Sequence, residues 1–408
     1  MPTLPSFAEA AAFAGGVLQH NLAGRSPRSA SSPNTNNPRR SQTTDSYFGS
    51  SNDMSFPQMS ARPAGGAGGG RYNEARRAFL RKLGEETLDV LSRGSYSFRG
   101  VDHALKLLIR ESNSNTKFYP SNEPKVMGWA SSQRPRRLSD QSSTHISILN
   151  ISTIDAARLL HNMYHNNPGE ENSITGVLNF ASATKPGGGF KNGAEAQEES
   201  IARASTLYPA LTTEEASHFY NLHKQESAQN NAAYYSHAMI YTPRVIVFRD
   251  DDGLWTYPFE IDVLTCAAVN AGEVLKNTTA GATPSVIVGI EKEMTERMGR
   301  ILFLFEKKGI RNIILGTFGT GVFRNDIGMI TRIWAQLLIV PTARFKDSFD
   351  RVIFAVTGET TFVDFKTGFE AWGEQRAVAK GLPSQNEHNG QNGHSNPGRT
   401  SILSRLRP

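Results

Sequence analysis

Residues 176–199 read Gly176-Val-Leu-Asn-Phe-Ala-Ser-Ala-Thr-Lys-Pro-Gly-Gly-Gly-Phe-Lys-Asn-Gly-Ala-Glu-Ala-Gln-Glu-Glu199. The apolar start of this stretch is typical of a buried strand, and three consecutive glycines, Gly187 to Gly189, follow it. Because glycine lacks a Cβ, backbone amides there can approach a ligand closely. Glu198 and Glu199 then begin a helix, on which neighbours point about 100° apart, so at most one of them faces a reacting bond. The same pattern also fits a flexible turn followed by an ordinary acidic first helical turn.

A second stretch repeats the order of strand, glycine-rich loop and helix, in Asn312-Ile-Ile-Leu-Gly-Thr-Phe-Gly-Thr-Gly-Val-Phe-Arg-Asn-Asp326. Phosphate groups fit at such strand-to-helix junctions. The loop is neither a dinucleotide-binding fingerprint nor a P-loop, because the glycine spacing differs and the P-loop lysine is missing. Two such loops in one sheet, one followed by a Glu pair and the other containing Phe323, suggest a diphosphate cleft with an aromatic lid. Phe323 fits a position in the core equally well.

Short β-rich runs alternate with helical stretches on both sides of these loops. We expect strands at His145–Leu149, Val177–Phe180, Val245–Phe248, Ile261–Ala267, Asn312–Gly316 and Val352–Val356. We expect helices at Ile154–His165, Thr213–Gln229, Lys292–Lys308 and Gly328–Leu338. This alternation predicts an α/β sandwich around a mostly buried sheet. Upstream, an amphipathic helix carrying Phe79 and Leu83 is expected to end at Gly94, and a second helix is expected over Val101–Glu111.

Composition limits the size and the class of the folded part. The chain has 408 residues, but residues 1–75 and 374–408 are low-complexity segments that we expect to be disordered, the second of them basic. A single cysteine, Cys266, excludes a disulfide framework and a Cys-rich zinc site, and its apolar surroundings indicate a core thiol. No apolar run approaches the ~18 residues of a membrane span, so we expect no membrane association. The net charge of +6 is compatible with anionic partners.

Two further patterns have simpler explanations than a metal site. His161 and His165 stand four residues apart on an expected helix, but position 162 is Asn where a zinc protease needs Glu, so a surface helix face is expected. The run Asp250-Asp-Asp-Gly253 lies between two strand-like runs and is most simply a hairpin turn.

Three glycines, seven residues and then Gln197-Glu198-Glu199 resemble the signature of microbial-type poly(ADP-ribose) glycohydrolases. The surroundings agree, with similarity in Leu178-Asn-Phe-Ala-Ser-Ala, Ser200-Ile-Ala-Arg-Ala-Ser, Tyr241-Thr-Pro-Arg-Val and Gly319-Thr-Gly-Val-Phe-Arg-Asn. The resemblance extends from about Ala78 to Trp372. It implies a macrodomain-like three-layer α/β/α sandwich with a mixed central sheet. Residues 76–140 would form an N-terminal helical extension with a basic loop, and residues 141–373 the ADP-ribose-binding catalytic core.

The resemblance also assigns roles to individual residues. Glu199 matches the catalytic general acid and base, and Glu198 matches the neighbour that holds the ribose hydroxyls. The implied substrate-binding residues are Asn179, Gly187, Gly188, Gly189, Phe190, Gln197, Gly319, Thr320, Gly321, Val322 and Phe323. The second loop departs from the family at three positions: Phe318, Thr320 and Arg324 stand where Trp, Cys and Gly are often found. No metal ion or cofactor is implied.

The implied activity is release of ADP-ribose from poly(ADP-ribose), mainly at chain ends, by cleavage of ribose–ribose O-glycosidic bonds. Such cleavage passes through an oxocarbenium-like state, so Glu199 would protonate the leaving oxygen while the diphosphate of the substrate assists. A reader that binds ADP-ribose without cleaving it, and a hydrolase of mono-ADP-ribosyl adducts on protein or nucleic acid, are the alternatives. We expect poly(ADP-ribose) or ADP-ribosylated protein as partner, a monomer, and a nuclear or cytoplasmic location.

Overall fold

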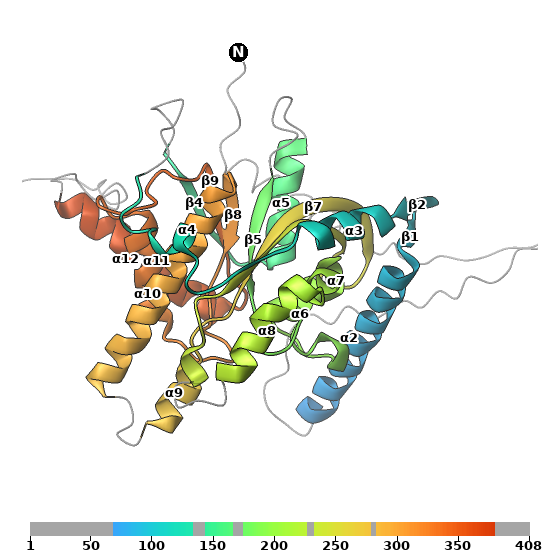
Figure 1. Ribbon diagram of the computed structural model, residues 1–408, viewed down its shortest axis with the longest axis horizontal. Coiled ribbons are helices and arrows are strands. Elements are labelled where there is room, and N and C mark those ends of the chain that lie inside the picture. Colours follow the sequence, from blue (N-terminus) through green and yellow to red (C-terminus); the bar gives the residue numbers. More distant parts are fainter. Residues whose placement is uncertain (1–67, 134–142, 166–173, 227–231, 279–282, 380–408) are drawn as a thin grey trace, which may run out of the picture.

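The structure, a computed structural model, describes residues 68–133, 143–165, 174–226, 232–278 and 283–379 (Figure 1). Its centre is a seven-stranded sheet with the order β3-β6-β7-β5-β8-β9-β4. The five strands from β7 to β4 run parallel, while β6 is antiparallel to β7 and β3 is antiparallel to β6. In chain order the strands are β3 Lys117–Tyr119, β4 His145–Leu149, β5 Thr175–Phe180, β6 Met239–Arg249, β7 Trp255–Cys266, β8 Asn312–Leu315 and β9 Arg351–Ala355.

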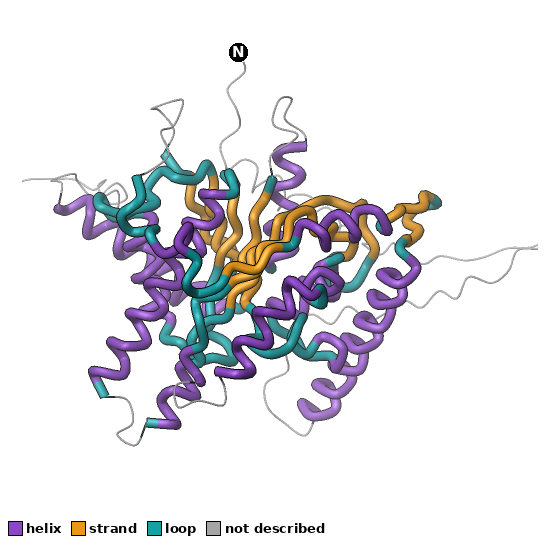
Figure 2. Tube along the Cα trace, in the orientation of Figure 1, coloured by secondary structure: helices purple, strands orange, loops and turns teal. Residues whose placement is uncertain are grey.

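Helices cover both faces of this sheet, which explains why successive residues of its central strands are mostly apolar and buried. Neighbouring residues of one strand, Val177 and Leu178, belong to the two different cores. The core around Val177 is covered by α5 Thr153–His165, α6 Gln197–Ala204, α7 Leu207–Leu211 and α8 Glu214–Glu226. The core around Leu178 is covered by α4 Pro124–Met127, α9 Ala271–Asn277, α10 Pro284–Lys307, α11 Ile327–Leu338 and α12 Glu359–Ala379. The tube in Figure 2 shows the sheet between these layers, and the expected mixed three-layer sandwich is confirmed.

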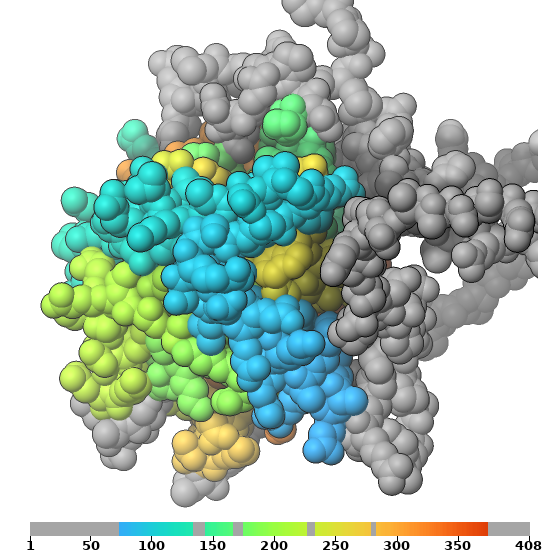
Figure 3. Space-filling model, turned by 90° about the vertical axis from the view of Figure 1, so that its right-hand side faces the viewer, coloured from blue at the N-terminus to red at the C-terminus, as the bar shows by residue number. Residues whose placement is uncertain are grey.

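A third, smaller core is formed by the N-terminal part of the described chain. Helix α2, Gly68–Arg93, ends where Gly94 takes a left-handed conformation with φ of 73° and donates its N–H to the carbonyl of Val90. The hairpin β1 Ser95–Phe98 and β2 Val101–Ala104 and the helix α3 Lys106–Asn115 follow. Their apolar residues pack against Ile246 and Phe248 of β6. In Figure 3 this blue and cyan segment lies across one side of the molecule, with part of the β6–β7 region visible beneath it.

The expected helix over Val101–Glu111 is wrong at its start. Residues Val101–Ala104 pair with β1 as the second strand of the hairpin, and helix α3 begins only at Lys106. The short alternating run Val101-Asp-His-Ala fits a strand as well as a helix, and pairing with β1 decides between them. Within the expected N-terminal extension, β3 also joins the main sheet as an edge strand beside β6.

The predicted turn at Asp250 to Gly253 and the predicted core cysteine are confirmed. Asp250 to Gly253 form the turn between β6 and β7, and Cys266 is fully buried. His161 and His165 stack on each other at 5.6 Å on α5. No helix of the described part is long and apolar enough to cross a membrane. Most of both expected disordered tails and the centre of the basic loop, 134–142, lie outside the described residues. Residues 68–75 and 374–379, which were expected to be disordered, belong instead to the helices α2 and α12.

Candidate active site

The two glycine loops follow neighbouring parallel strands, β5 and β8, and therefore meet at the carboxyl ends of these central strands. A cavity of about 830 Å³ lies at these strand ends. The first loop and the start of α6 supply Gly188, Gly189, Gln197, Glu198 and Glu199 to its wall, and the second loop supplies Gly319, Thr320, Gly321, Val322 and Phe323. Two segments separated by more than a hundred residues thus form one site, as the sequence predicted for the loops.

Glu198 is the more deeply buried of the two adjacent carboxylates, with 2% of its surface exposed. Its Oε2 accepts a hydrogen bond from the backbone N–H of Ser182 at 2.6 Å, and its Oε1 accepts one from Nδ2 of Asn179 at 3.4 Å. Burial raises the pKa of Glu198 to about 8, and the negative charge of Glu199 adds to the rise. Glu198 is therefore mostly protonated at neutral pH, so at most one of the two adjacent carboxyl groups is charged.

Glu199 lies closer to the open side of the cavity. Its Oε1 accepts a hydrogen bond from the backbone N–H of Gly189 at 2.8 Å. Gly188 has φ of 59°, and a Cβ at this position would lie 2.3 Å from the same oxygen. The first glycine loop therefore wraps directly over the carboxylate, which only residues without a side chain allow.

Gln197 fastens the start of α6 to the rest of the site. Its Oε1 accepts a hydrogen bond from the backbone N–H of Phe180 at 2.8 Å, at the end of β5. Its Nε2 donates to the carbonyl of Leu178 at 2.7 Å and to Oγ1 of Thr153 at 3.2 Å. One amide thus connects β5, α5 and α6, so the two glutamates that follow are held at a fixed place beside the carboxyl end of β5.

The second loop is supported from behind by the segment after β7. Gly319, with φ of 80°, lies so close to this segment that a Cβ would meet Ala268 at 2.5 Å. Nδ2 of Asn325 donates to the carbonyls of Val269 and Gly319, at 2.7 and 3.0 Å. The carbonyl of Phe323 accepts the N–H of Gly272 at 3.0 Å. The loop backbone is therefore fixed on the side away from the cavity.

Three of the residues implied for substrate binding lie behind the cavity wall. Asn179 is fully buried and bonds Glu198 and Oγ1 of Thr265. Phe190 is 1% exposed and packs on Tyr208 with ring centroids 5.0 Å apart. Gly187 lies against the rings of both residues. In this structure these residues support the first loop, and their contact with a ligand stays a prediction.

The three positions at which the second loop departs from the family pattern differ in how deeply they are buried. Phe318 is fully buried against Phe180, and Oγ1 of Thr320 donates to the carbonyl of Thr317. Arg324 has φ of 57° and its aliphatic chain passes over Gly272, outside the cavity lining. Glycine adopts the left-handed conformation found at position 324 at lower cost than arginine does.

The sequence analysis did not predict one wall of the cavity, which is formed by residues distant in sequence from both glycine loops. Arg76, Leu80 and Leu83 of α2 line the cavity, together with Arg249 to Asp251 from the turn between β6 and β7. Arg76 binds Glu195 at 2.8 Å, and this ion pair joins α2 to the loop before α6. The helical periodicity of α2 predicted an apolar face but could not indicate what that face covers.

The comparisons with known proteins agree with this arrangement. The family model described as the catalytic domain of microbial-type PARG matches residues 84–250. A crystal structure of poly(ADP-ribose) glycohydrolase from Thermomonospora curvata matches with a TM-score of 0.62 and 30% sequence identity, covering 72% of this chain and 99% of that chain. This chain belongs to the microbial-type poly(ADP-ribose) glycohydrolases.

Two further structures of such glycohydrolases carry ligands. One is the Thermomonospora curvata enzyme bound to the inhibitor ADP-HPD, with a TM-score of 0.60 and 29% identity over 72% of this chain and 99% of that chain. The other is the Deinococcus radiodurans enzyme in complex with ADP-ribose, with a TM-score of 0.54 and 29% identity over 64% of this chain and 97% of that chain. The comparison with curated proteins gave no match.

Family membership confirms the resemblance seen in the sequence and makes this chain an enzyme, a glycohydrolase with poly(ADP-ribose) as its substrate class. Among the residues that the structure describes, no group of three or more His, Cys, Asp or Glu side chains is arranged to hold a metal ion. The identities of the acid, the base and the bound groups have to be argued from the site itself.

Proposed function

We propose that this glycohydrolase cleaves the ribose–ribose bond of poly(ADP-ribose) with Glu199 as general acid and then general base. The observation that carries the proposal is the position of Glu199 at the cavity wall, between both glycine loops, with Oε1 held by the N–H of Gly189. Since Oε1 already accepts this hydrogen bond, the proton that is delivered to the leaving oxygen sits on Oε2. After departure of the leaving ribose, the carboxylate removes a proton from the attacking water.

Glu198 holds the hydroxyl groups of the ribose in this mechanism. With its pKa raised to about 8, the buried side chain is a neutral carboxylic acid near pH 7. A neutral acid donates one hydrogen bond and accepts others, which suits neighbouring hydroxyl groups better than an acceptor-only carboxylate does. Its neutrality also leaves Glu199 as the one nearby carboxyl that changes charge during the reaction.

The oxocarbenium-like transition state needs a negative group near the reacting carbon. The diphosphate of the substrate supplies this charge, bound along the backbone of the loops at Gly188–Gly189 and Gly319–Val322. Phe323 packs on the ribose end of the ligand from the second loop. Cleavage occurs mainly at chain ends, where one terminal ADP-ribose unit enters the cavity.

The test compares two substrates and follows product length. Purified poly(ADP-ribose) should release free ADP-ribose from the first time points, without an early rise of long oligomers. Early oligomers would contradict cleavage at chain ends. Faster release from a defined mono-ADP-ribosylated peptide than from polymer would favour a mono-ADP-ribosyl hydrolase, and tight binding of ADP-ribose without any release would favour a reader.

A further inference from the structure

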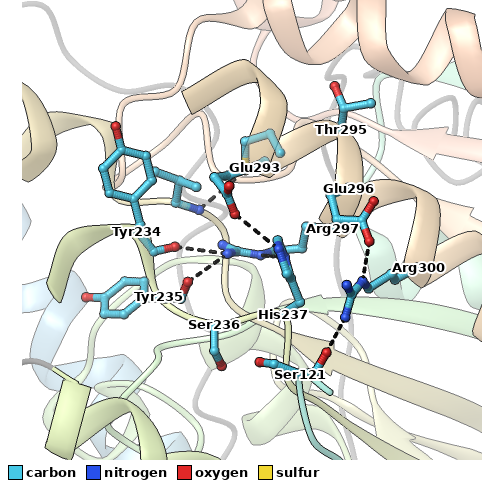
Figure 4. A network of polar contacts seen from close by, with 12 residues as sticks. Ser121, Tyr234, Tyr235, Ser236, His237, Glu293, Thr295, Glu296, Arg297 and Arg300 are labelled. Atoms are coloured by element: carbon cyan, nitrogen blue, oxygen red, sulfur yellow. Dashed lines mark hydrogen bonds and ion pairs between the residues drawn. The ribbon is translucent and has the colours of Figure 1, made fainter. Parts of the chain in front are cut away.

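A buried arginine organises the chain next to the second loop (Figure 4). Arg297 of α10 has none of its surface exposed. Its Nη1 donates to the carbonyl of Ala267 at 3.0 Å, and its Nη2 donates to the carbonyls of Tyr234 and Tyr235, both at 2.9 Å. Ala267 directly follows β7, and Tyr234 ends the short helix η2, Ala232–Tyr234. One guanidinium therefore joins two separate segments beneath the site.

The position of Arg297 is itself fixed by a histidine and a glutamate. Its Nε donates to Nδ1 of His237 at 3.4 Å, and Nε2 of His237 lies 3.1 Å from Oε2 of Glu293. These partners assign the proton of a neutral imidazole to Nε2. Burial and the charges of Arg297 and Arg300 lower the pKa of His237 to about 3, in agreement with a neutral ring.

Tyr235 is held in an uncommon conformation by this network. Its φ is 50°, in the left-handed region that non-glycine residues seldom adopt. Its carbonyl accepts a hydrogen bond from Arg297. The backbone N–H of the next residue, Ser236, donates to Nε2 of His223 at 3.1 Å, and the Ser236 hydroxyl forms a hydrogen bond with the same nitrogen at 2.8 Å. Contacts on both sides thus determine where the tyrosine ring points.

The ring of Tyr235 is directed at the aromatic residue of the second loop. Its centroid lies 5.8 Å from that of Phe323, at an interplanar angle of 43°, and 5.6 Å from the ring of His223 on its other side. Phe323 lines the cavity, whereas Tyr235 is not part of the lining. Tyr235 is therefore placed to act on the ligand through Phe323.

We propose that Tyr235 is a positioning residue that fixes the ring of Phe323 at the ribose end of the cavity, with Arg297 fixing Tyr235 in turn. This inference rests on the proposed function, because it uses the contact between Phe323 and ADP-ribose. Removal of the Tyr235 ring leaves Phe323 free to change rotamer, so the ligand must order it on binding.

A double-mutant cycle tests the inference, with ADP-ribose affinity measured by calorimetry for wild type, Tyr235→Leu, Phe323→Leu and the double variant. We expect Tyr235→Leu to weaken binding about 2- to 10-fold, the range of one aromatic pair, and to have less than about a twofold effect once Phe323 is already replaced. Tyr235→Phe, which keeps the ring, should restore the affinity. An equal loss in both backgrounds, or no loss from Tyr235→Leu, would overturn the inference.

Two controls separate positioning from folding. Tyr257→Leu removes an exposed tyrosine outside the cavity lining and should leave the affinity unchanged. Thermal unfolding of each variant reports on stability, while the affinity and stoichiometry of the folded fraction report on positioning. A lower melting temperature of Tyr235→Leu with wild-type affinity would mean that the residue acts in stability alone and would overturn the inference.

A second readout does not depend on the ligand. Phe323→Trp introduces an indole beside Tyr235, and its emission is the difference from the spectrum of the same protein with Phe323, because the chain already holds four tryptophans. Adding Tyr235→Leu should shift this difference emission to longer wavelength, because the indole loses its packed neighbour. Unchanged emission would overturn the inference even if ADP-ribose binds. Conversely, absence of ADP-ribose binding by wild type, together with a clear emission shift, would refute the proposed function and leave the contact between Tyr235 and Phe323 established.

Discussion

Gly188 and Glu199 fit against each other so closely that a Cβ on the glycine would lie 2.3 Å from the Oε1 atom of the glutamate. Oε1 also accepts the N–H of Gly189, the next residue in the loop. The loop and the carboxylate therefore hold a single geometry together. Position 188 needs glycine because the chain there passes directly over a side chain that lines the cavity.

Gly188→Ala should therefore remove most of the activity. The new methyl group would displace the Glu199 carboxylate, and a left-handed φ of 59° is strained for alanine. Since misplacement by about 1 Å can cost ~100-fold, we expect kcat to fall by about that factor. The measurement is ADP-ribose release under saturating polymer. Gly373→Ala in α12, where a Cβ would meet nothing within 4 Å, is the matched control and should keep wild-type kcat.

Binding of ADP-ribose should weaken at alkaline pH. The pKa of Glu198 is raised to about 8, so its side chain is protonated below that pH and negative above it. The ionised side chain repels the diphosphate and can no longer donate a hydrogen bond to the ribose. Calorimetry should therefore find that the affinity for ADP-ribose falls between about pH 7 and 9. Glu198→Gln should bind with little dependence on pH in this range. Equal slopes for wild type and Glu198→Gln would contradict this assignment.

His237 should make the protein less stable in acid. Its folded-state pKa is lowered from 6.5 to about 3, so the unfolded chain binds the additional proton between these values and stability is lost as the pH falls below 6.5. Because the pKa of Glu198 is raised, its contribution to stability increases as the pH falls through part of this range. The effect of His237 is therefore the difference between wild type and a His237 variant. Between about pH 7.5 and 5, His237→Gln should lose about 1–2 kcal/mol less than wild type in urea unfolding. Parallel loss in both proteins would exclude His237 as the cause.

Arg324→Gly should stabilise the fold. Arg324 has φ of 57°, where an L-residue other than glycine costs about 1 kcal/mol. The aliphatic contact with Gly272 offsets part of this, so we expect the free energy of unfolding to rise by about 0.5 kcal/mol. Arg110→Gly in the exposed interior of α3 is the opposite case and should cost about 1 kcal/mol. Destabilisation by both substitutions would show that the side chain of Arg324 outweighs its backbone strain.

The sequence was sufficient to predict the six strands β4 to β9 and both loops, because these depend on local patterns, whereas β1, β2 and β3 were not predicted. Val177–Phe180 and Asn312–Gly316 are apolar runs that lead into glycine-rich loops, and they form neighbouring strands whose loops line one cavity. The spacing from Gly187 to Glu199 indicated the family, since it fixes how a loop returns over a helix start. These features need no knowledge of distant contacts.

The rest depends on contacts between distant segments. Nothing local indicates that Leu83 of α2 reaches the cavity, or that Arg297 binds the carbonyl of Tyr235 across 62 positions. Phe190 follows the glycines, and its ring lies behind the cavity wall, 5.0 Å from that of Tyr208, which no local pattern indicates. A single sequence carries the apolar character of such a residue but not the direction of its side chain.

The central claim, that Glu199 is the acid and base, is tested most directly by Glu199→Gln, which keeps the shape of the side chain and removes the ionisable oxygen. Wild type, this variant and Glu214→Gln, an exposed glutamate of α8, are compared in ADP-ribose release from polymer and in ADP-ribose affinity. We predict that Glu199→Gln loses at least about 100-fold in release while its affinity stays within about threefold of wild type, and that Glu214→Gln behaves as wild type. Release by Glu199→Gln at a rate near that of wild type would contradict the account.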